Sequence, residues 1–182
     1  MKKSGTEIVQ EDAPVLREVA ETVPESVFGT PELSKLVADM SVALDAQPEG
    51  VALAAPQVGV SWRLFIVRAD RSMTAAEIEK QGALPKKIEP KVDVYINPEI
   101  IKTSRKRGET EEGCLSVRGV YGTTRPHERV TLRARRVDGT SFERGGGGLL
   151  AQIFEHEVNH LNGILFIDHA EHLIHIPHAD SE

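Results

Sequence analysis

The sequence predicts a single α+β domain of short strands and two helices, one of them buried. With 182 residues and 40% hydrophobic side chains, the chain suits one core, because chains divide into several domains only at larger sizes. Apolar residues recur at helical spacing over residues 30–47 and 149–161. Short apolar runs bounded by turn-forming residues lie between these two segments and are typical of strands. We therefore treat residues 1–182 as one domain.

The first elements are helical. Residues 14–20, "PVLREVA", predict a short helical turn after a proline. Residues 30–47 predict a longer helix, in which Thr30 caps the first turn and Pro31 takes the first helical position. This helix has one apolar stripe and stops at Pro48 and Gly50. The stripe consists of Leu33, Leu36, Val37, Met40 and Leu44.

The middle of the chain predicts strands. Residues 62–67, "WRLFIV", and 92–100 are apolar runs of strand length. Residues 129–138 and 140–145 predict a hairpin, because Asp138-Gly139 is a strong turn signal. Residues 69–93 are mixed and charged, so we expect a long surface excursion with a marginal helix around residues 74–80.

The last part of the chain predicts a buried helix and a polar tail. Gly145–Gly148 are expected to form a flexible lead-in to the helix, which stops at Asn162-Gly163. Residues 164–169 are expected to form a short apolar strand or turn. Histidines recur every third residue from 169 to 178, and this polar interleaving near a terminus favours a solvated, flexible tail over about residues 170–182.

Composition excludes several classes of protein. The formal charge is −6 and there is no basic block, which argues against nucleic-acid binding. A single cysteine argues against a disulfide-built secreted domain and favours a reducing compartment. The first ten residues lack the apolar stretch of a secretory signal, and no run is long enough to span a membrane. We expect an intracellular protein.

The segment "HEVNH" indicates a metal site. His156 and His160 are one helical turn apart, so both imidazoles can bind one cation. Glu157 lies beside them, where a carboxylate can take a proton from metal-activated water. The surrounding helix is apolar almost all round, and two histidines buried without a role would be costly. The apolar residues are Leu149, Leu150, Ile153, Phe154, Val158 and Leu161.

Two histidines do not complete a catalytic site, which typically has three protein ligands. Downstream candidates for the third ligand are Asp168, His169 and Glu171. Upstream, Cys114 offers a thiolate, a strong ligand for zinc or ferrous iron; alone it would more often be an inert buried thiol. Spacing does not choose between them.

Three motifs in order resemble those of the peptide deformylase family. Residues 50–57, "GVALAAPQ", look like the first motif of that family, G-x-G-L-A-A-x-Q. Residues 112–116, "EGCLS", match the second, and residues 155–163, "EHEVNHLNG", are similar to the third, Q-H-E-x-D-H-x-x-G. The resemblance covers nearly the whole chain.

This resemblance implies an α+β fold in which antiparallel sheets pack around a central helix that carries the H-E-x-x-H motif. The implied activity is a metal-dependent hydrolase that removes the N-formyl group from the initiator methionine of new polypeptides and releases formate. Cys114, His156 and His160 would bind the metal, physiologically Fe2+, with Zn2+ or Ni2+ as substitutes. Glu157 would be the acid/base. The Gln57 amide and the Leu115 backbone N–H would face the substrate carbonyl oxygen.

The resemblance also implies partners. N-formyl-methionyl nascent peptides would be the substrate, with a transient ribosome contact expected from that role. We expect a monomer in a bacterial-type cytoplasm. Gly50, Val51, Ala52 and Gly113 would contact the substrate, and Val51, Leu115 and Ile153 are candidates to line a slot for the methionine side chain. Plain core packing is their alternative role.

The chain departs from the family pattern at four positions, although none of them is a proposed ligand. Ala52 replaces a glycine and Glu155 replaces a glutamine. Asn159 replaces an aspartate, whose carboxylate could have paired with a basic side chain such as Arg125. Arg118 stands where proline is common. Two other functions remain open: a metalloprotease with a downstream third ligand, and a metal-binding module without activity.

Overall fold

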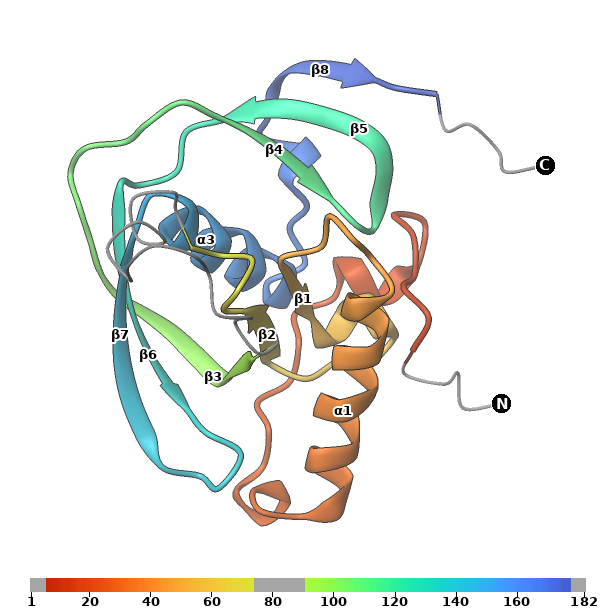
Figure 1. The fold of residues 1–182 in the computed structure, drawn as a ribbon, viewed down its shortest axis with the longest axis vertical. Helices are drawn as coiled ribbons and strands as arrows, with labels where there is room; N and C mark the ends of the chain where they lie inside the picture. The colour runs from red at the N-terminus through yellow and green to blue at the C-terminus, as the bar shows by residue number, and fades with distance from the viewer. Residues whose placement is uncertain (1–5, 74–90, 178–182) are drawn as a thin grey trace, which may run out of the picture.

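The computed structural model describes residues 6–73 and 91–177 (Figure 1). The α-helices are α1 (Pro31–Asp45) and α3 (Leu149–Leu161). Single 3-10 turns are η1 (Pro14–Arg17), η2 (Glu25–Val27), η3 (Ala55–Val58) and η4 (Phe166–Asp168). The strands are β1 (Ala52–Ala54), β2 (Leu64–Arg68), β3 (Val92–Thr103), β4 (Thr110–Cys114), β5 (Val117–Thr124), β6 (Arg129–Arg135), β7 (Ser141–Gly147) and β8 (Glu171–His175).

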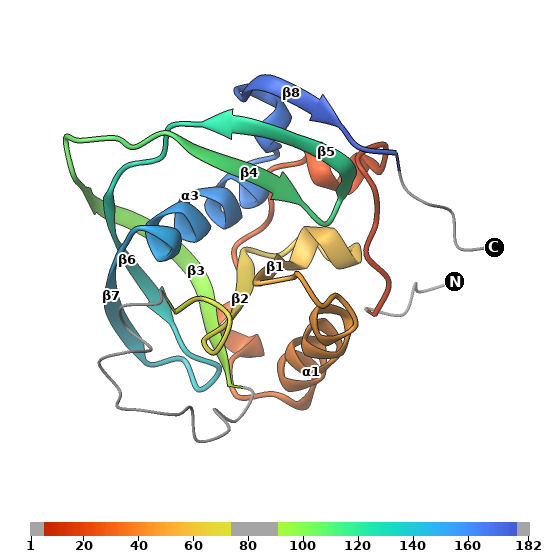
Figure 2. The same ribbon diagram turned by 45° about the horizontal axis from the view of Figure 1, so that its top comes forward.

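The strands form two antiparallel sheets, which confirms the predicted α+β class. The larger sheet has the order β1-β2-β3-β6-β7 and the smaller sheet the order β4-β5-β8. Each strand pair is antiparallel. Helix α3 contacts β1, β6 and β7 of the larger sheet, and Figure 2 shows β4 and β5 passing on the other side of it.

Aromatic packing attaches α3 to the larger sheet. The Phe154 ring lies 5.3 Å from the Tyr95 ring, edge to face, and Tyr95 stacks on Phe65 at 4.8 Å. All three side chains are buried, and burying one such side chain stabilises the fold by about 1.5–3 kcal/mol. This contact fixes the helix that carries His156 and His160.

Both predicted helices are confirmed. The Thr30 hydroxyl accepts the N–H of Leu33 and caps α1, whose stripe is buried except at the half-buried Val37. The predicted turn after residue 13 is η1, and the predicted hairpin is β6–β7, with Gly139 at φ +87°. Among the described residues, neither helix has the length and apolar run needed to cross a bilayer.

The glycine run differs from the prediction of a flexible lead-in. Residues 145–147 continue β7 and pair with residues 129–131 of β6. The missing side chains let α3 approach the sheet, because a Cβ at Gly146 would lie 2.7 Å from Cγ of Leu150. Only Gly148 has a left-handed backbone, with φ +55°, where the chain turns from strand into helix.

The tail also differs, since residues 171–175 form β8 and pair with β5. Their side chains are all exposed, so backbone hydrogen bonds to β5 order a segment whose sequence has no buried face. Of the predicted excursion, residues 92–93 belong to β3, whereas the marginal helix at 74–80 and His178 lie outside the described residues.

Gly163 ends α3 with a backbone that only glycine suits, and we expect Gly163→Ala to destabilise the protein by about 2–5 kcal/mol. Its φ is +73°, and an added Cβ would lie 2.6 Å from the Arg17 carbonyl oxygen. Gly29 has the same φ and no atom within 4 Å of that position, so Gly29→Ala should cost only about 1–2 kcal/mol. Urea denaturation of both variants measures the difference; equal losses would contradict the steric explanation.

Candidate metal centre

Cys114 lies at the tip of a β-hairpin that was not predicted from the sequence. Strand β4 ends at this cysteine and β5 begins at Val117, which is its pairing partner. The backbone N–H of Ser116 lies 3.4 Å from the Cys114 sulfur, within the range of an N–H···S contact. The turn "CLS" therefore directs the half-buried thiol toward α3.

Cys114 meets both histidines of the H-E-x-x-H motif. One ligand atom from each of Cys114, His156 and His160 lies within 4.8 Å of the others. The Cys114 Sγ to His160 Nε2 distance is 3.3 Å, and the two imidazole centroids are 4.8 Å apart. Within residues 6–73 and 91–177, this is the only such group of three, and its sulfur and nitrogen donors suit zinc or ferrous iron.

The downstream alternatives for the third ligand do not join this group. The Asp168 carboxylate pairs with Arg17 at 2.6 Å and accepts the N–H of Leu165 at 3.0 Å. His169 is exposed, and Glu171 lies in β8 with an exposed side chain. The geometry on which the metalloprotease interpretation depends is therefore absent from the described residues.

Glu112 orients His156, a role that was not predicted from the sequence. Its Oε1 contacts Nδ1 of His156, and its Oε2 accepts the hydroxyl of Thr124. Burial acts to raise the pKa of Glu112, but hydrogen bonds to His156 and Thr124 outweigh it and leave the pKa below its usual value. A carboxylate on one ring nitrogen leaves Nε2 of His156 free for a metal. In the sequence, the only sign of this contact is that Glu112 is the first residue of the motif "EGCLS".

The charges around the two histidines fit a bound cation. Burial opposes protonation of His156, yet Cys114 and Glu112 beside it raise its pKa well above the usual value. The negative groups that favour a proton there also favour a divalent cation. Burial, with the neighbouring His156 charge, lowers the pKa of His160 well below its usual value, which keeps that imidazole in the neutral, ligating form.

Glu157 has the environment of an acid/base group. It is 3% exposed, and its Oε2 has no hydrogen-bond partner among the described residues. Burial raises its pKa to about 7. A carboxyl group with that pKa can accept and return a proton near neutral pH.

Gln57 presents its amide nitrogen to Cys114. The side-chain Oε1 accepts the N–H of Ala54 at 2.9 Å, which fixes which end of the amide faces the thiol. Its Nε2 lies 3.1 Å from the Ser116 hydroxyl and 3.6 Å from the Cys114 sulfur. The carbonyl of Leu115 is held by the Gln10 side chain at 3.2 Å, which steadies the turn beside the thiol.

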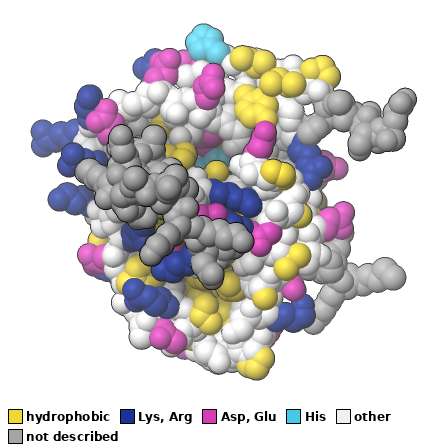
Figure 3. All heavy atoms as spheres, viewed as in Figure 1, with side chains coloured by type: hydrophobic (Ala, Val, Ile, Leu, Met, Phe, Trp, Pro, Cys, Tyr) yellow, Lys and Arg dark blue, Asp and Glu magenta, His cyan; other side chains and the backbone are white. Residues whose placement is uncertain are grey.

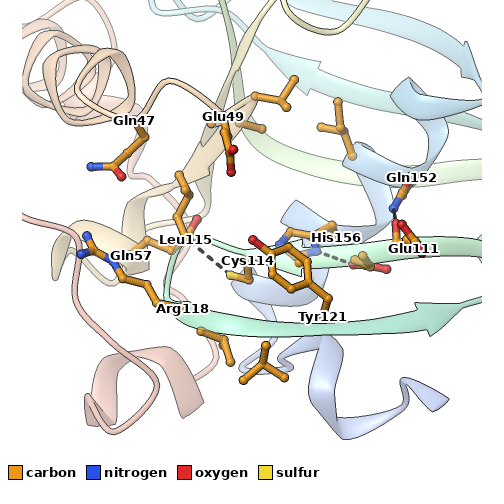
Figure 4. Close-up of a pocket in the computed structure, with 18 of the residues that line it drawn as sticks. Gln47, Glu49, Gln57, Glu111, Cys114, Leu115, Arg118, Tyr121, Gln152 and His156 are labelled. Atoms are coloured by element: carbon orange, nitrogen blue, oxygen red, sulfur yellow. Dashed lines mark hydrogen bonds and ion pairs between the residues drawn. The ribbon is translucent and has the colours of Figure 1, made fainter. Parts of the chain in front are cut away.

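A cavity of about 600 Å³ opens beside these groups (Figure 4). Figure 4 shows Gln57, Cys114 and His156 at its floor, Glu49 and Gln47 on one side, and Tyr121 on the other. The sequence-predicted contact residues all line this cavity, and so do the residues proposed for the methionine slot. These residues are Gly50, Val51, Ala52, Gly113, Leu115 and Ile153.

Two of the departures from the family pattern, Glu155 and Asn159, belong to the metal-site helix α3. The carboxylate of Glu155 pairs with the His127 ring and accepts the His127 N–H at 2.9 Å. Arg125 pairs with Glu109 at 3.2 Å, and together with Asn159 it lines a second cavity of about 410 Å³. Contact between Glu155 and His127 therefore ties α3 to the segment before β6.

Known proteins of one family are similar to this chain over most of its length. A sequence model of the family described as polypeptide deformylase matches residues 6–174. The chain is 40% identical over 158 residues to a peptide deformylase of Dehalococcoides mccartyi, covering 87% of this chain and 81% of the relative. It is likewise 40% identical over 160 residues to one from Acidobacterium capsulatum, covering 88% and 83%.

Solved structures of similar proteins share the fold. A peptide deformylase from Legionella pneumophila is 37% identical with a TM-score of 0.73, over 89% of this chain and 83% of that one. A class I type b peptide deformylase from Acinetobacter baumannii with Met-Ala-Ser bound is 30% identical with a TM-score of 0.74, over 89% and 97%.

Proposed function

This chain belongs to the peptide deformylase family, and we propose that the cavity beside Cys114 is where it acts. The enzyme is a hydrolase that removes the N-formyl group from newly made polypeptides. The observation that carries the assignment of the site is the convergence of Cys114, His156 and His160 within 4.8 Å, next to the buried Glu157. We infer that α3 is the central helix around which the two sheets are arranged.

The proposed metal ligands are Cys114, His156 and His160. Bound there, a divalent ion would lower the pKa of a coordinated water toward neutrality and polarise the formyl carbonyl group. Glu112 would keep Nε2 of His156 turned toward the ion through its contact with Nδ1. The Cys114 thiolate would carry one negative charge beside the two neutral imidazoles. It would therefore neutralise part of the positive charge of the ion.

Glu157 would move the proton. It accepts a proton from the attacking water, whose oxygen forms a bond to the formyl carbon. The same carboxyl group then gives the proton to the nitrogen as the carbon–nitrogen bond breaks. The products are the α-amino group and formic acid, which loses its proton to the amine and leaves as formate. A pKa of about 7 suits both steps.

Gln57 and Leu115 would stabilise the oxyanion. The Gln57 amide nitrogen faces Cys114, and the Leu115 backbone N–H belongs to the turn that follows that cysteine. Donors fixed before the reaction lower the barrier because they need no reorganisation as the charge develops, and one such donor typically contributes about 2.7–4 kcal/mol. The apolar Val51, Leu115 and Ile153 would accept the methionine side chain.

We propose Fe2+ as the working metal, and an anaerobic assay tests this. Enzyme reloaded separately with Fe2+, Ni2+ and Zn2+ is assayed for formate release from formyl-Met-Ala-Ser. The iron form should be active and should lose activity in air, because the metal and the Cys114 thiolate are both open to oxidation. The nickel and zinc forms are the controls. Equal lifetimes of the iron form with and without oxygen would argue against iron.

Replacement of Glu112 by glutamine should weaken metal binding by about 10–100-fold, because the support of His156 is reduced. Competition against a chromophoric chelator measures the affinity. Glu109→Gln is the matched control, since that exposed carboxylate pairs with Arg125 and not with a proposed ligand. Unchanged affinity in Glu112→Gln would contradict the orienting role.

One catalytic domain would act as a monomer on formylated nascent chains in a bacterial-type cytoplasm. A transient contact with the ribosome follows from a substrate that is still being made. Sedimentation velocity of the purified chain measures the oligomeric state.

A further inference from the structure

Exposed apolar side chains gather over β5 and β8, beside the cavity (Figure 3). Tyr121 on β5 is 41% exposed, and Ile174 and Ile176 at β8 are 58% and 55% exposed. We call these three residues the β8 strip. Single exposed apolar residues are common, but a contiguous group of large ones marks an interaction surface.

Strand register puts the three side chains of the strip on one face. Tyr121 and Ile174 are direct cross-strand partners, and such pairs point to the same side of a sheet about 5 Å apart. Ile176 lies two residues beyond Ile174, so it returns to that face. Its N–H donates to the Gly119 carbonyl at 2.7 Å, which keeps it beside β5.

The strip begins at the wall of the cavity. Tyr121 lines the cavity as well as belonging to the strip, and its ring lies against Gly113 on β4 (Figure 4). A Cβ at Gly113 would be 2.9 Å from that ring. The surface is therefore continuous from the floor at Cys114, along Tyr121, to Ile174 and Ile176.

Leu173 belongs to the opposite face. One of its methyl groups would be 2.8 Å from a Cβ at Gly122, and Ala170 packs at the same place. Leu173 is 42% exposed, comparable to the members of the strip. It therefore offers a comparison residue in the same strand that does not face the cavity.

We propose that the β8 strip binds the nascent polypeptide beyond its first three residues, at roughly the fourth to sixth residue, and favours apolar side chains there. The inference rests on the proposed function of the cavity. Adjacent strands are about 4.8 Å apart, and an extended peptide advances about 3.3 Å per residue, so a chain that passes Tyr121 reaches Ile174 within about two residues. The three side chains of the strip are uncharged, which suits an apolar segment.

Extended substrates test the proposal. The peptides are formyl-Met-Ala-Ser alone, with the extension Leu-Ile-Leu, and with the extension Ser-Gly-Ser. In the wild-type enzyme, kcat/KM should be about 4- to 15-fold higher for the apolar than for the polar extension, the equivalent of burying one or two methylene groups. The double variant Ile174→Thr/Ile176→Thr should lose this preference and keep its activity on the tripeptide. Threonine retains the β-branch that strands favour.

Two controls make the outcomes distinct. Leu173→Thr and Val42→Thr, the latter at an exposed position of α1, should keep the preference. A preference retained in the double variant, or lost equally in Leu173→Thr, would overturn the proposal. A dimer that the double variant dissociates in sedimentation velocity would also overturn it, because a second copy would then occupy the strip. Failure of the wild type to release formate from the tripeptide would instead contradict the proposed function.

Discussion

Replacement of Glu157 by alanine or glutamine is expected to reduce formate release by about 10²–10⁴-fold while the metal stays bound. The proposed ligands, Cys114, His156 and His160, remain in place, so metal content measured by mass spectrometry should match that of the wild type. Proton transfer by a positioned carboxyl group contributes about 10²–10⁴-fold. We expect kcat to fall by that range with formyl-Met-Ala-Ser, because no other described carboxylate combines full burial with a free oxygen beside the ligands.

Glu155→Gln is the matched control for Glu157→Gln. Both changes replace a carboxylate by an amide on α3, but the Glu155 carboxylate contacts His127, which is not one of the proposed ligands. The Glu155→Gln variant should therefore keep most of the activity. Near-normal formate release by Glu157→Gln would remove the acid/base assignment, and an equal loss in Glu155→Gln would point to a general effect on the helix.

Helices α1 and α3 were predictable because their signals are local. Thr30 and Pro31 mark the start of α1, and its apolar stripe recurs every three or four residues. Gly163 marks the end of α3 with its positive φ. Helix formation depends on neighbours within one or two turns, so a single sequence contains most of the information needed.

The smaller sheet was not predictable in the same way. Strands β4 and β5 carry glycines and charged residues without a regular alternation, and all five side chains of β8 are exposed. These segments form strands because their backbones pair across the sheet. The same reason explains the error at residues 145–147, where β6 supplies the hydrogen bonds and Leu150 fills the space above Gly146.

The residues of the candidate site also differ in how far the sequence predicted them, for the same reason. Spacing on one helix indicated His156, Glu157 and His160 but left the third ligand open. The family resemblance assigned it to Cys114, and the fold places that residue beside His160. The contact of Glu112 with His156 was missed, because it depends on how β4 lies against α3. Convergence of residues from separate elements is a property of packing, and no local pattern contains it.

Replacement of Cys114 by alanine is expected to remove the metal and with it the activity. One of three donors is lost, and the remaining His156 and His160 cannot complete a site that typically needs three protein ligands. Loss of a residue that only hydrogen-bonds to a ligand lowers metal affinity by about 10–100-fold. Loss of a ligand itself should therefore lower it by more than about 100-fold. Metal content after gel filtration and anaerobic formate release are the measurements.

His169→Ala is the comparison that separates the two possible ligand sets. His169 was one of three downstream candidates in the metalloprotease interpretation, but it is exposed and outside the group formed by Cys114, His156 and His160. This variant should keep both metal and activity. Metal retained in Cys114→Ala but lost in His169→Ala would move the third ligand downstream. Because the Cys114 thiol is half-buried at the tip of the β4–β5 hairpin, alanine leaves little space to fill there. The loss should therefore appear in metal binding rather than in the urea midpoint of the metal-free protein.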